Sequence, residues 1–350
     1  MRRLVLSFVT IALLLAHVPA RADDLLLDRF QDYLEALRTQ AGIPGLSASV
    51  IGYNQTAWER AFGKQDNERA IATRTDTPFQ LDGLTQVLTS AIVLRCLEEG
   101  ELSLDDPLGK FSAGTVDANL TIRQALSHTS ADQVFRYRLD RVDALAPAIA
   151  ACTGNPFVES FARRLGLFSM RDSVPGSNVV QLAPTSSANL TSSMLDQYRS
   201  VLGRLASPYA VDARGVASPS RYVATTLTPS SGLISTVQDV GQFVLGLRTP
   251  RLIVSTETLA MAWRPGLGAN SQPLPHGLGW FVQSYNGETI VWQFGVSSGA
   301  SSSLIVMVPG RGLTLVLLAN SDGLSWPFPL ASGDLTVSPF GRLFLGLFVR

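Results

Sequence analysis

Apolar residues recur along the chain in two patterns, one helical and one alternating. At the start, the residues of 25–38 repeat every three or four positions, with Leu27, Phe30, Leu34 and Leu37 on one face, which predicts an amphipathic helix. Ile43-Pro44-Gly45 breaks this pattern. The short runs 46–51 and 56–62 then read as two strands around a turn at 52–55.

The middle of the chain is helical in pattern. A broad apolar stripe over 84–97 predicts a helix, with Asp82 as its cap and Gly100 at its end. Shorter helices are expected at 121–126, 142–152 and 157–165. The segment 171–228 is rich in Ser, Pro and Ala and reads as long loops with short helices.

Strand-like runs return towards the C-terminus. A helix at 236–247 precedes four of them, at 277–283, 289–293, 302–308 and 314–320. Strands at both ends and helices between them predict one sheet built from both termini. We therefore expect an α/β (α+β) protein with a sheet domain over 23–75 and 230–350, and an inserted helical domain over 76–229.

Residues 1–22 have the pattern of a secretory signal peptide. Arg2 and Arg3 precede a short apolar run, and Ala20-Arg21-Ala22 offers small residues at the two positions that a signal peptidase reads. Cleavage after Ala22 predicts a periplasmic or secreted protein. An uncleaved anchor is the alternative, and no later apolar run is long enough to span a membrane.

Charge and cysteine content exclude some functions. Loss of 1–22 changes the formal charge from 0 to −3 (25 basic against 28 acidic residues), which argues against a nucleic-acid partner. Cys96 and Cys152 both fall in apolar helical stretches, so two buried free thiols are expected, with a disulfide as the alternative. Two cysteines and few histidines leave little for a structural metal, and we expect no metal and no cofactor.

Several longer motifs occur in a fixed order. They are Phe-Gln-Leu-Asp-Gly-Leu-Thr-Gln at 79–86, Leu-Ser-Leu-Asp-Asp-Pro at 102–107, Leu-Thr-Ile-Arg-Gln-Ala-Leu-Ser-His-Thr-Ser at 120–130, Gly-Leu-Ile-Ser-Thr at 232–236 and Gly-Leu-Gly-Trp at 277–280. From about residue 28 to about 323, the chain resembles the serine β-lactamase-related family: class C β-lactamases, D-alanyl-D-alanine peptidases and related esterases. The resemblance implies a β-lactamase/transpeptidase-like fold, an antiparallel sheet flanked by helices plus a helical domain.

The family's nucleophilic serine and its lysine partner are both replaced. The resemblance places them three residues apart at the start of a helix, on one face, where they can share a proton. Those positions hold Gly83 and Gln86. Glycine has no side chain to acylate, and glutamine cannot accept the proton.

Two further family elements are also altered. The Tyr-x-Asn element reads Tyr137-Arg138-Leu139, so only the tyrosine is kept, and we expect it to be a packed wall residue. The Lys/His-x-Gly element reads Gln293-Phe294-Gly295, so the cation that would hold a substrate carboxylate is lost.

The backbone elements of the site survive these substitutions. The resemblance assigns the oxyanion hole to the backbone N–H groups of Gly83 and Val296. Asp82 stands beside them and either occupies these donors or simply caps the helix. The expected cleft thus comprises Asp82, Gly83, Tyr137, Phe294, Gly295 and Val296. His128 and His276 are expected to be structural.

Three functions remain open. The first is an exported pseudoenzyme, inactive in acyl transfer, that binds a small ligand, a cell-wall peptide or a protein partner. The second is an active hydrolase with a rearranged site that uses Tyr137 or one of Ser297 and Ser298. The third is a structural interaction module in which Leu139 and Phe294 fill the former substrate space.

Overall fold

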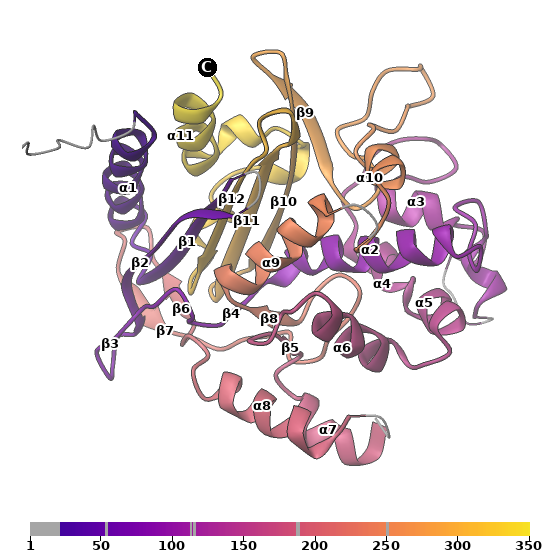
Figure 1. The fold of residues 1–350 in the computed structure, drawn as a ribbon, viewed down its shortest axis with the longest axis horizontal. Helices are drawn as coiled ribbons and strands as arrows, with labels where there is room; N and C mark the ends of the chain where they lie inside the picture. The colour runs from indigo at the N-terminus through magenta and orange to yellow at the C-terminus, as the bar shows by residue number, and fades with distance from the viewer. Residues whose placement is uncertain (1–21, 53–54, 113, 115–116, 187–189, 250–251) are drawn as a thin grey trace, which may run out of the picture.

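A computed structural model describes residues 22–350 except 53–54, 113, 115–116, 187–189 and 250–251. The predicted signal peptide therefore lies outside the described residues, apart from Ala22. Figure 1 shows a twisted sheet with helices on both faces and a mainly helical region beside it.

The main sheet has seven strands in the order β3-β2-β1-β12-β11-β10-β9, with antiparallel neighbours. They are β1 (Gly45–Ile51), β2 (Thr56–Asp66), β3 (Ile71–Ala72), β9 (Phe281–Tyr285), β10 (Glu288–Ser297), β11 (Ser301–Val308) and β12 (Leu313–Ala319). Strands from the two ends meet where β1 pairs with β12, with Leu46 opposite Ala319. The predicted fold class is confirmed, while the exact domain boundaries stay a prediction.

Helices cover the two faces of this sheet. On one face α1 (Ala22–Gln40) and α11 (Pro339–Phe348) pack through Phe30 and Phe344. On the other lie α2 (Thr85–Glu98) and α9 (Val237–Arg248). Alternation along β10 separates the two cores, because Val291 joins the α2 side while Trp292 joins the α1 side.

The remaining elements up to α10 lie between β3 and β9 along the chain. They are β4 (Phe79–Gln80), η1 (Asp82–Leu84), η2 (Leu108–Lys110), α3 (Ile122–Ser127), α4 (Leu139–Asp143), α5 (Ala146–Thr153), α6 (Phe157–Leu167), β5 (Val174–Pro175), α7 (Val179–Ser186), α8 (Ser192–Leu202), β6 (Tyr209–Val211), β7 (Ala217–Pro219), β8 (Leu233–Ser235) and α10 (Thr256–Ala262). Short 3₁₀ turns follow near the C-terminus. They are η3 (Pro309–Arg311), η4 (Asp322–Leu324), η5 (Leu330–Ser332) and η6 (Leu335–Val337).

Two predicted elements are placed differently. The single helix expected at 142–152 is two helices, α4 and α5, because Pro147 cannot continue a helix and stands in the first turn of α5 instead. The strand expected at 277–283 begins only at Phe281. Gly279 has φ +82°, and a Cβ on it would lie 2.5 Å from Ser90 Cβ, so this segment turns against α2.

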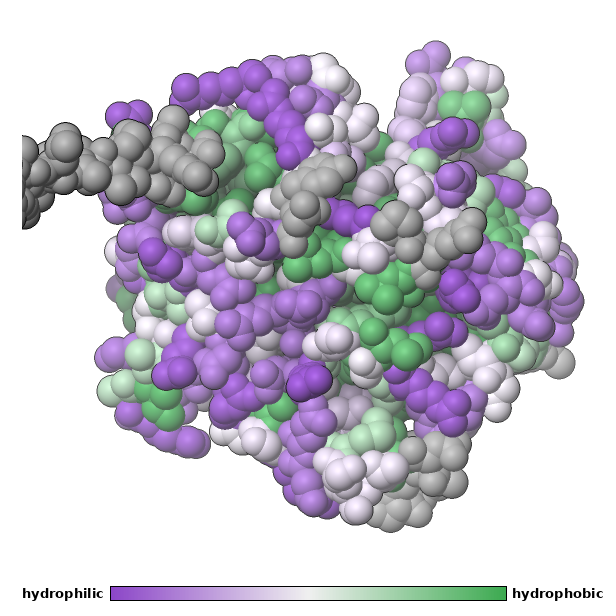
Figure 2. All heavy atoms as spheres, in the orientation of Figure 1, coloured by the Kyte–Doolittle hydropathy of each residue, from purple (hydrophilic) through white to green (hydrophobic). Residues whose placement is uncertain are grey.

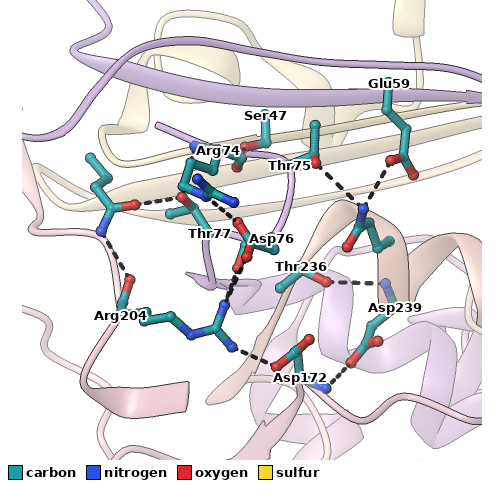
Figure 3. A network of polar contacts seen from close by, with 12 residues as sticks. Ser47, Glu59, Arg74, Thr75, Asp76, Thr77, Asp172, Arg204, Thr236 and Asp239 are labelled. Carbon is teal, nitrogen blue, oxygen red and sulfur yellow. Dashed lines mark hydrogen bonds and ion pairs between the residues drawn. The ribbon is translucent and has the colours of Figure 1, made fainter. Parts of the chain in front are cut away.

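Polar side chains join the sheet to segment 172–204 (Figure 3). Arg204 forms an ion pair with Asp172 at 2.5 Å and donates to the backbone carbonyl of Asp76 at 2.7 Å. Asp239 in turn accepts from the backbone N–H of Asp172 at 2.7 Å. Burial raises the pKa of Asp239 to about 6. This network therefore links the segment around Asp76, the segment 172–204 and α9.

Cys96 and Cys152 form a disulfide, so the expectation of two free thiols is wrong. α2 and α5 pack against each other and bring the two Cα atoms to 6.1 Å, across 56 residues of sequence. Sequence patterns could place both cysteines on buried helix faces but could not supply this distance.

Polar side chains cover most of the face seen in Figure 2, with smaller apolar groups between them. Among the described residues, no helix combines the length and the apolar character that a membrane crossing requires.

Candidate functional site

The chain turns sharply between β4 and α2, where the family's nucleophile is expected. Asp82 has φ +49°, a conformation that a short polar side chain tolerates better than most. Gly83 follows within η1, which is buried against β10 and β11. The site is therefore built where a strand, a helix start and the sheet edge meet.

Gly83 leaves no room for a side chain. A Cβ on this residue would lie 2.9 Å from the carbonyl oxygen of Phe294 and 3.3 Å from the Tyr137 hydroxyl. The first neighbour is backbone in the middle of a paired strand, so it cannot move aside cheaply. Gly295 makes the reciprocal contact, because a Cβ there would lie 2.0 Å from the Leu81 carbonyl. The backbones of the two segments therefore approach each other closely at Gly83 and Gly295.

Gln86, at the lysine position, is fully buried and makes three hydrogen bonds. Its amide NH₂ donates to the Gly83 carbonyl at 2.9 Å and to the Tyr137 hydroxyl at 2.7 Å. Its amide oxygen lies 2.8 Å from His128 Nε2. Because an amide oxygen can only accept, Nε2 carries the proton and donates to Gln86, and Nδ1 accepts from the Arg138 N–H at 3.0 Å.

The hydrogen bonds continue from Tyr137 to β10. The Tyr137 hydroxyl donates to Gln293 Oε1 at 3.3 Å, and the same oxygen accepts from the Phe294 N–H at 2.9 Å. Gln293 Nε2 donates to the Gly279 carbonyl at 3.3 Å. We call Gln86, His128, Tyr137 and Gln293 the polar latch. Each donor in it has an acceptor, and it contains no carboxylate, lysine or arginine.

Tyr137 also covers the free end of β10. β9 pairs with β10 only as far as Trp292, so the part of β10 from Gln293 onward extends beyond its neighbour. The Tyr137 ring stacks on Phe294, with centroids 5.3 Å apart, and lies 5.4 Å from Phe281. Tyr137 therefore closes the strand edge that the sequence predicted as the border of a cleft.

The Asp82 carboxyl does not cap the helix, so that prediction is wrong. It points to the sheet and accepts a hydrogen bond from the Ser301 hydroxyl at 2.6 Å. η1 and α2 start without a side-chain cap. Burial raises the pKa of Asp82 to about 7, against the opposing hydrogen bonds from Ser301 and Gln80.

The other titratable groups near the latch are held neutral. Burial lowers the pKa of His128 to about 3, and it lowers that of the buried His276 well below its usual value. Burial raises the pKa of the Tyr137 hydroxyl, although Gln86 donates to it. No described group at the latch is therefore poised to accept a proton near neutral pH, apart from Asp82 beside it.

The remaining predicted residues lie at the margin. Leu139 begins α4 and is half-buried, and it is absent from the described apolar clusters, whereas Phe294 is buried among aromatic rings. Val296 and Ser297 are half-buried and Ser298 is exposed. Among the described residues, no hydrogen bond joins Ser297 or Ser298 to a histidine or lysine.

Sequence reasoning missed two groups of residues. His128 and His276 were expected to be structural, but their contact with the altered positions was not foreseen. Ser301 and Ser303 were not singled out, although both serve the turn; Ser303 donates to the Leu81 carbonyl at 2.7 Å. Their alternation in β11 is the signal that would place both on the α2 side of the sheet.

The described cavities lie elsewhere. Of the cavities that the described residues line, five have walls that contain none of Gly83, Gln86, Tyr137 and Gln293. Nor do the described residues contain a group of three or more His, Cys, Asp or Glu side chains that could hold a metal ion.

The antiparallel sheet, the helices on its two faces and this buried turn form a β-lactamase/transpeptidase-like fold, and comparison with known families agrees. The family model named Beta-lactamase matches residues 30–332. The chain therefore belongs to the β-lactamase family.

Solved structures of the same fold are similar over most of the chain. A penicillin-binding protein homologue from Pyrococcus abyssi, described as octameric, has a TM-score of 0.74 at 17% identity and covers 93% of this chain and 78% of its own. A class C β-lactamase from Rhodobacter sphaeroides has a TM-score of 0.67 at 16% identity, with 92% and 99% covered. At these identities the likeness is one of fold.

A curated relative matches over a shorter segment. Penicillin-binding protein 4 of Amycolatopsis lactamdurans is 32% identical over 107 residues, which are 29% of this chain and 28% of the relative. The aligned segment thus spans little more than a quarter of that relative's length.

Proposed function

We propose that this protein is an exported, non-acylating member of the β-lactamase family, in which the former active site has become part of the structural core. The observation that carries the proposal is the position of Gly83. Its missing side chain would collide with the Phe294 carbonyl, and the lysine position next to it is held by three hydrogen bonds of Gln86. A covalent route needs a nucleophile and a base in that space.

The closed edge of β10 argues for partner binding elsewhere on the molecule rather than in the old cleft. Tyr137 stacks on Phe294 and bonds to Gln86 and Gln293, so a ligand at this edge would have to displace several contacts at once. This supports the interaction-module hypothesis, with Phe294 rather than Leu139 as the filling residue. A cell-wall peptide, another small ligand or a protein partner would then bind another surface.

Export is supported by the disulfide. Cystines persist in oxidising compartments and are rare in the cytosol. The Cys96–Cys152 bond therefore fits the predicted signal peptide and a periplasmic or secreted location.

A rearranged hydrolase is the alternative, since the scaffold and the backbone donors of Gly83 and Val296 are kept. Its weakness is the missing base, because the Tyr137 phenol is held neutral and its hydroxyl is already bound to two amide side chains.

The test is covalent labelling of the purified protein with a fluorescent penicillin and a fluorophosphonate, followed by intact mass, with nitrocefin and p-nitrophenyl ester hydrolysis alongside. We expect no adduct and no turnover above buffer. An adduct on any residue would contradict the proposal. Turnover that is lost in Tyr137→Phe would favour the rearranged hydrolase, whereas turnover unchanged in Tyr137→Phe, Ser297→Ala and Ser298→Ala would indicate a contaminating enzyme.

A further inference from the structure

A cavity of about 460 Å³ lies beside the polar latch but is separate from it. Its walls come from α3 with the residues after it, and from the hairpin that follows α10. The volume falls in the range of about 300–1,000 Å³ that is usual for small-molecule sites. The cavity is therefore large enough for a ligand, and the former active site does not contribute to it.

The cavity and the latch share their wall. Ser127 and Thr129 line the cavity, while His128 between them has φ +53° and directs its ring to Gln86. Gly277 and Leu278 line it as well, next to His276, whose ring packs edge-on against His128 at 4.8 Å. The contacts that close the old site thus also fix one wall of the new one.

One part of the cavity wall is apolar. Side chains of this kind come from α10, from the hairpin and from the segment after it: Met261, Pro265, Leu267, Leu274 and Leu278. Leu267 is 62% exposed although it is a large apolar residue. It stands in a hairpin held by backbone hydrogen bonds from Gly268 to Gln272 at 2.9 Å and from Leu274 to Gly266 at 2.7 Å. An exposed leucine on an ordered rim is a surface that an apolar ligand would cover.

The charged residues of the wall leave one positive charge unbalanced. Arg123 is bonded to Asp105 through two contacts of 2.9 and 3.2 Å, so this pair is close to neutral. Arg264 also lines the cavity, on the same hairpin as Leu267. Among the described residues, no hydrogen bond or ion pair involves its guanidinium group. A guanidinium offers paired donors that match a carboxylate.

We propose that this cavity binds a small amphipathic monoanion, with its carboxylate on Arg264 and its apolar body against Leu267, Leu274 and Leu278. One unpaired guanidinium balances one negative charge, which favours a monocarboxylate over a doubly charged phosphate. The apolar wall favours an alkyl or aromatic body over a sugar or a free amino acid. Binding in this cavity does not require the latch residues to be catalytically active, because none of them lines its wall.

The test is isothermal titration calorimetry of the mature protein with octanoate, with 1-octanol as the uncharged analogue and inorganic phosphate as the anion without an apolar body. We expect octanoate to bind with one site per chain, and both other probes to bind at least tenfold more weakly. Octanol or phosphate binding as tightly as octanoate, or no octanoate binding at millimolar concentration, would overturn the proposal.

Substitutions at two positions, Arg264 and Leu267, locate the site without disturbing the core. Arg264→Gln should weaken octanoate binding by roughly tenfold to a hundredfold, since it removes a charge-assisted hydrogen bond, and Arg264→Lys should recover part of it. Leu267→Asp places a carboxylate on the exposed rim and should weaken binding further. Arg214→Gln, an exposed arginine in the turn between β6 and β7, is the matched control and should bind as the wild type does. Equal affinity in Arg264→Gln and the wild type would show that the cavity is not the site.

Discussion

The two sides of the wall formed by residues 127–129 and 276–278 differ in almost every property that binding requires. On one side, the polar latch consists of the fully buried Gln86, His128 and Gln293 and the half-buried Tyr137. It contains no formally charged residue, and its side-chain donors bond to the protein itself. On the other, the cavity is open and amphipathic, and the guanidinium group of Arg264 in its wall has no hydrogen-bond or ion-pair partner among the described residues. Under the proposed function, a scaffold of this family would have filled its former site with internal hydrogen bonds and left a neighbouring cavity open.

The strongest test of this contrast is to put the family's residues back. Gly83→Ser with Gln86→Lys forces a Cβ to within 2.9 Å of a strand carbonyl and puts an amine into a fully buried, neutral pocket. Overpacking costs about 1–3 kcal/mol, and an unpaired buried charge costs more. We expect the unfolding free energy in urea to fall by about 4 kcal/mol or more, with no penicillin adduct. A stable double variant that hydrolyses nitrocefin would show that the site is only two residues from activity.

A smaller change opens the latch without adding volume or charge. Gln86→Leu leaves the His128 Nε2–H without its acceptor and the Gly83 carbonyl without its donor, both in a buried place. We expect a loss of about 2–3 kcal/mol in the unfolding free energy, measured in urea. Gln238→Leu is the matched control, because Gln238 is exposed on α9 and its loss should cost under about 0.5 kcal/mol. Similar effects of the two changes would mean that the latch is not a stabilising network.

The pH dependence of stability sharpens the contrast at Asp82. Its folded pKa, about 7, lies above the usual value of 3.8, so the folded state keeps a proton that the unfolded state has lost. This contribution is complete below about pH 4 and disappears as the pH rises through 7. Relative to Asp82→Asn, the wild type should therefore lose stability by at most about 1.4 kcal/mol per pH unit between pH 4 and 7.

The measurement is urea unfolding of both proteins from pH 4 to 8. The neutral His128 and His276 have the opposite effect, because their lowered pKa values make stability rise with pH up to about 6.5. Both histidines are present in the wild type and in Asp82→Asn, so their effect cancels in the difference between the two proteins. A difference that stays constant over the range would contradict a buried, protonated Asp82.

The sequence predicted most of the fold and the location of the site. Helical and alternating patterns placed α2 and β10–β12 to within a few residues, because each element buries one face or both. The resemblance to the family placed Gly83, Gln86, Tyr137 and Gln293 in one site, and in the structure Tyr137 contacts the other three. These features are local in the chain, or follow from the resemblance to the family.

The contacts between distant segments could not be predicted. Asp82 was expected to cap a helix, because an aspartate before a helix usually does, but Ser301 on a strand more than two hundred residues away offers it a partner. Likewise, Cys96 and Cys152 pair because α2 and α5 pack together. Only the tertiary structure decides which of several local options a side chain takes.

The Tyr137 segment has a consequence for solubility. A strand that extends past its neighbour presents unpaired backbone groups, and such an edge can recruit a strand from another molecule. Here the Phe294 N–H is occupied by Gln293, and the ring of Tyr137 lies against Phe294. If the edge does not have to admit a substrate, as under the proposed function, we expect the same tyrosine to hinder edge-to-edge pairing with a second copy of the chain.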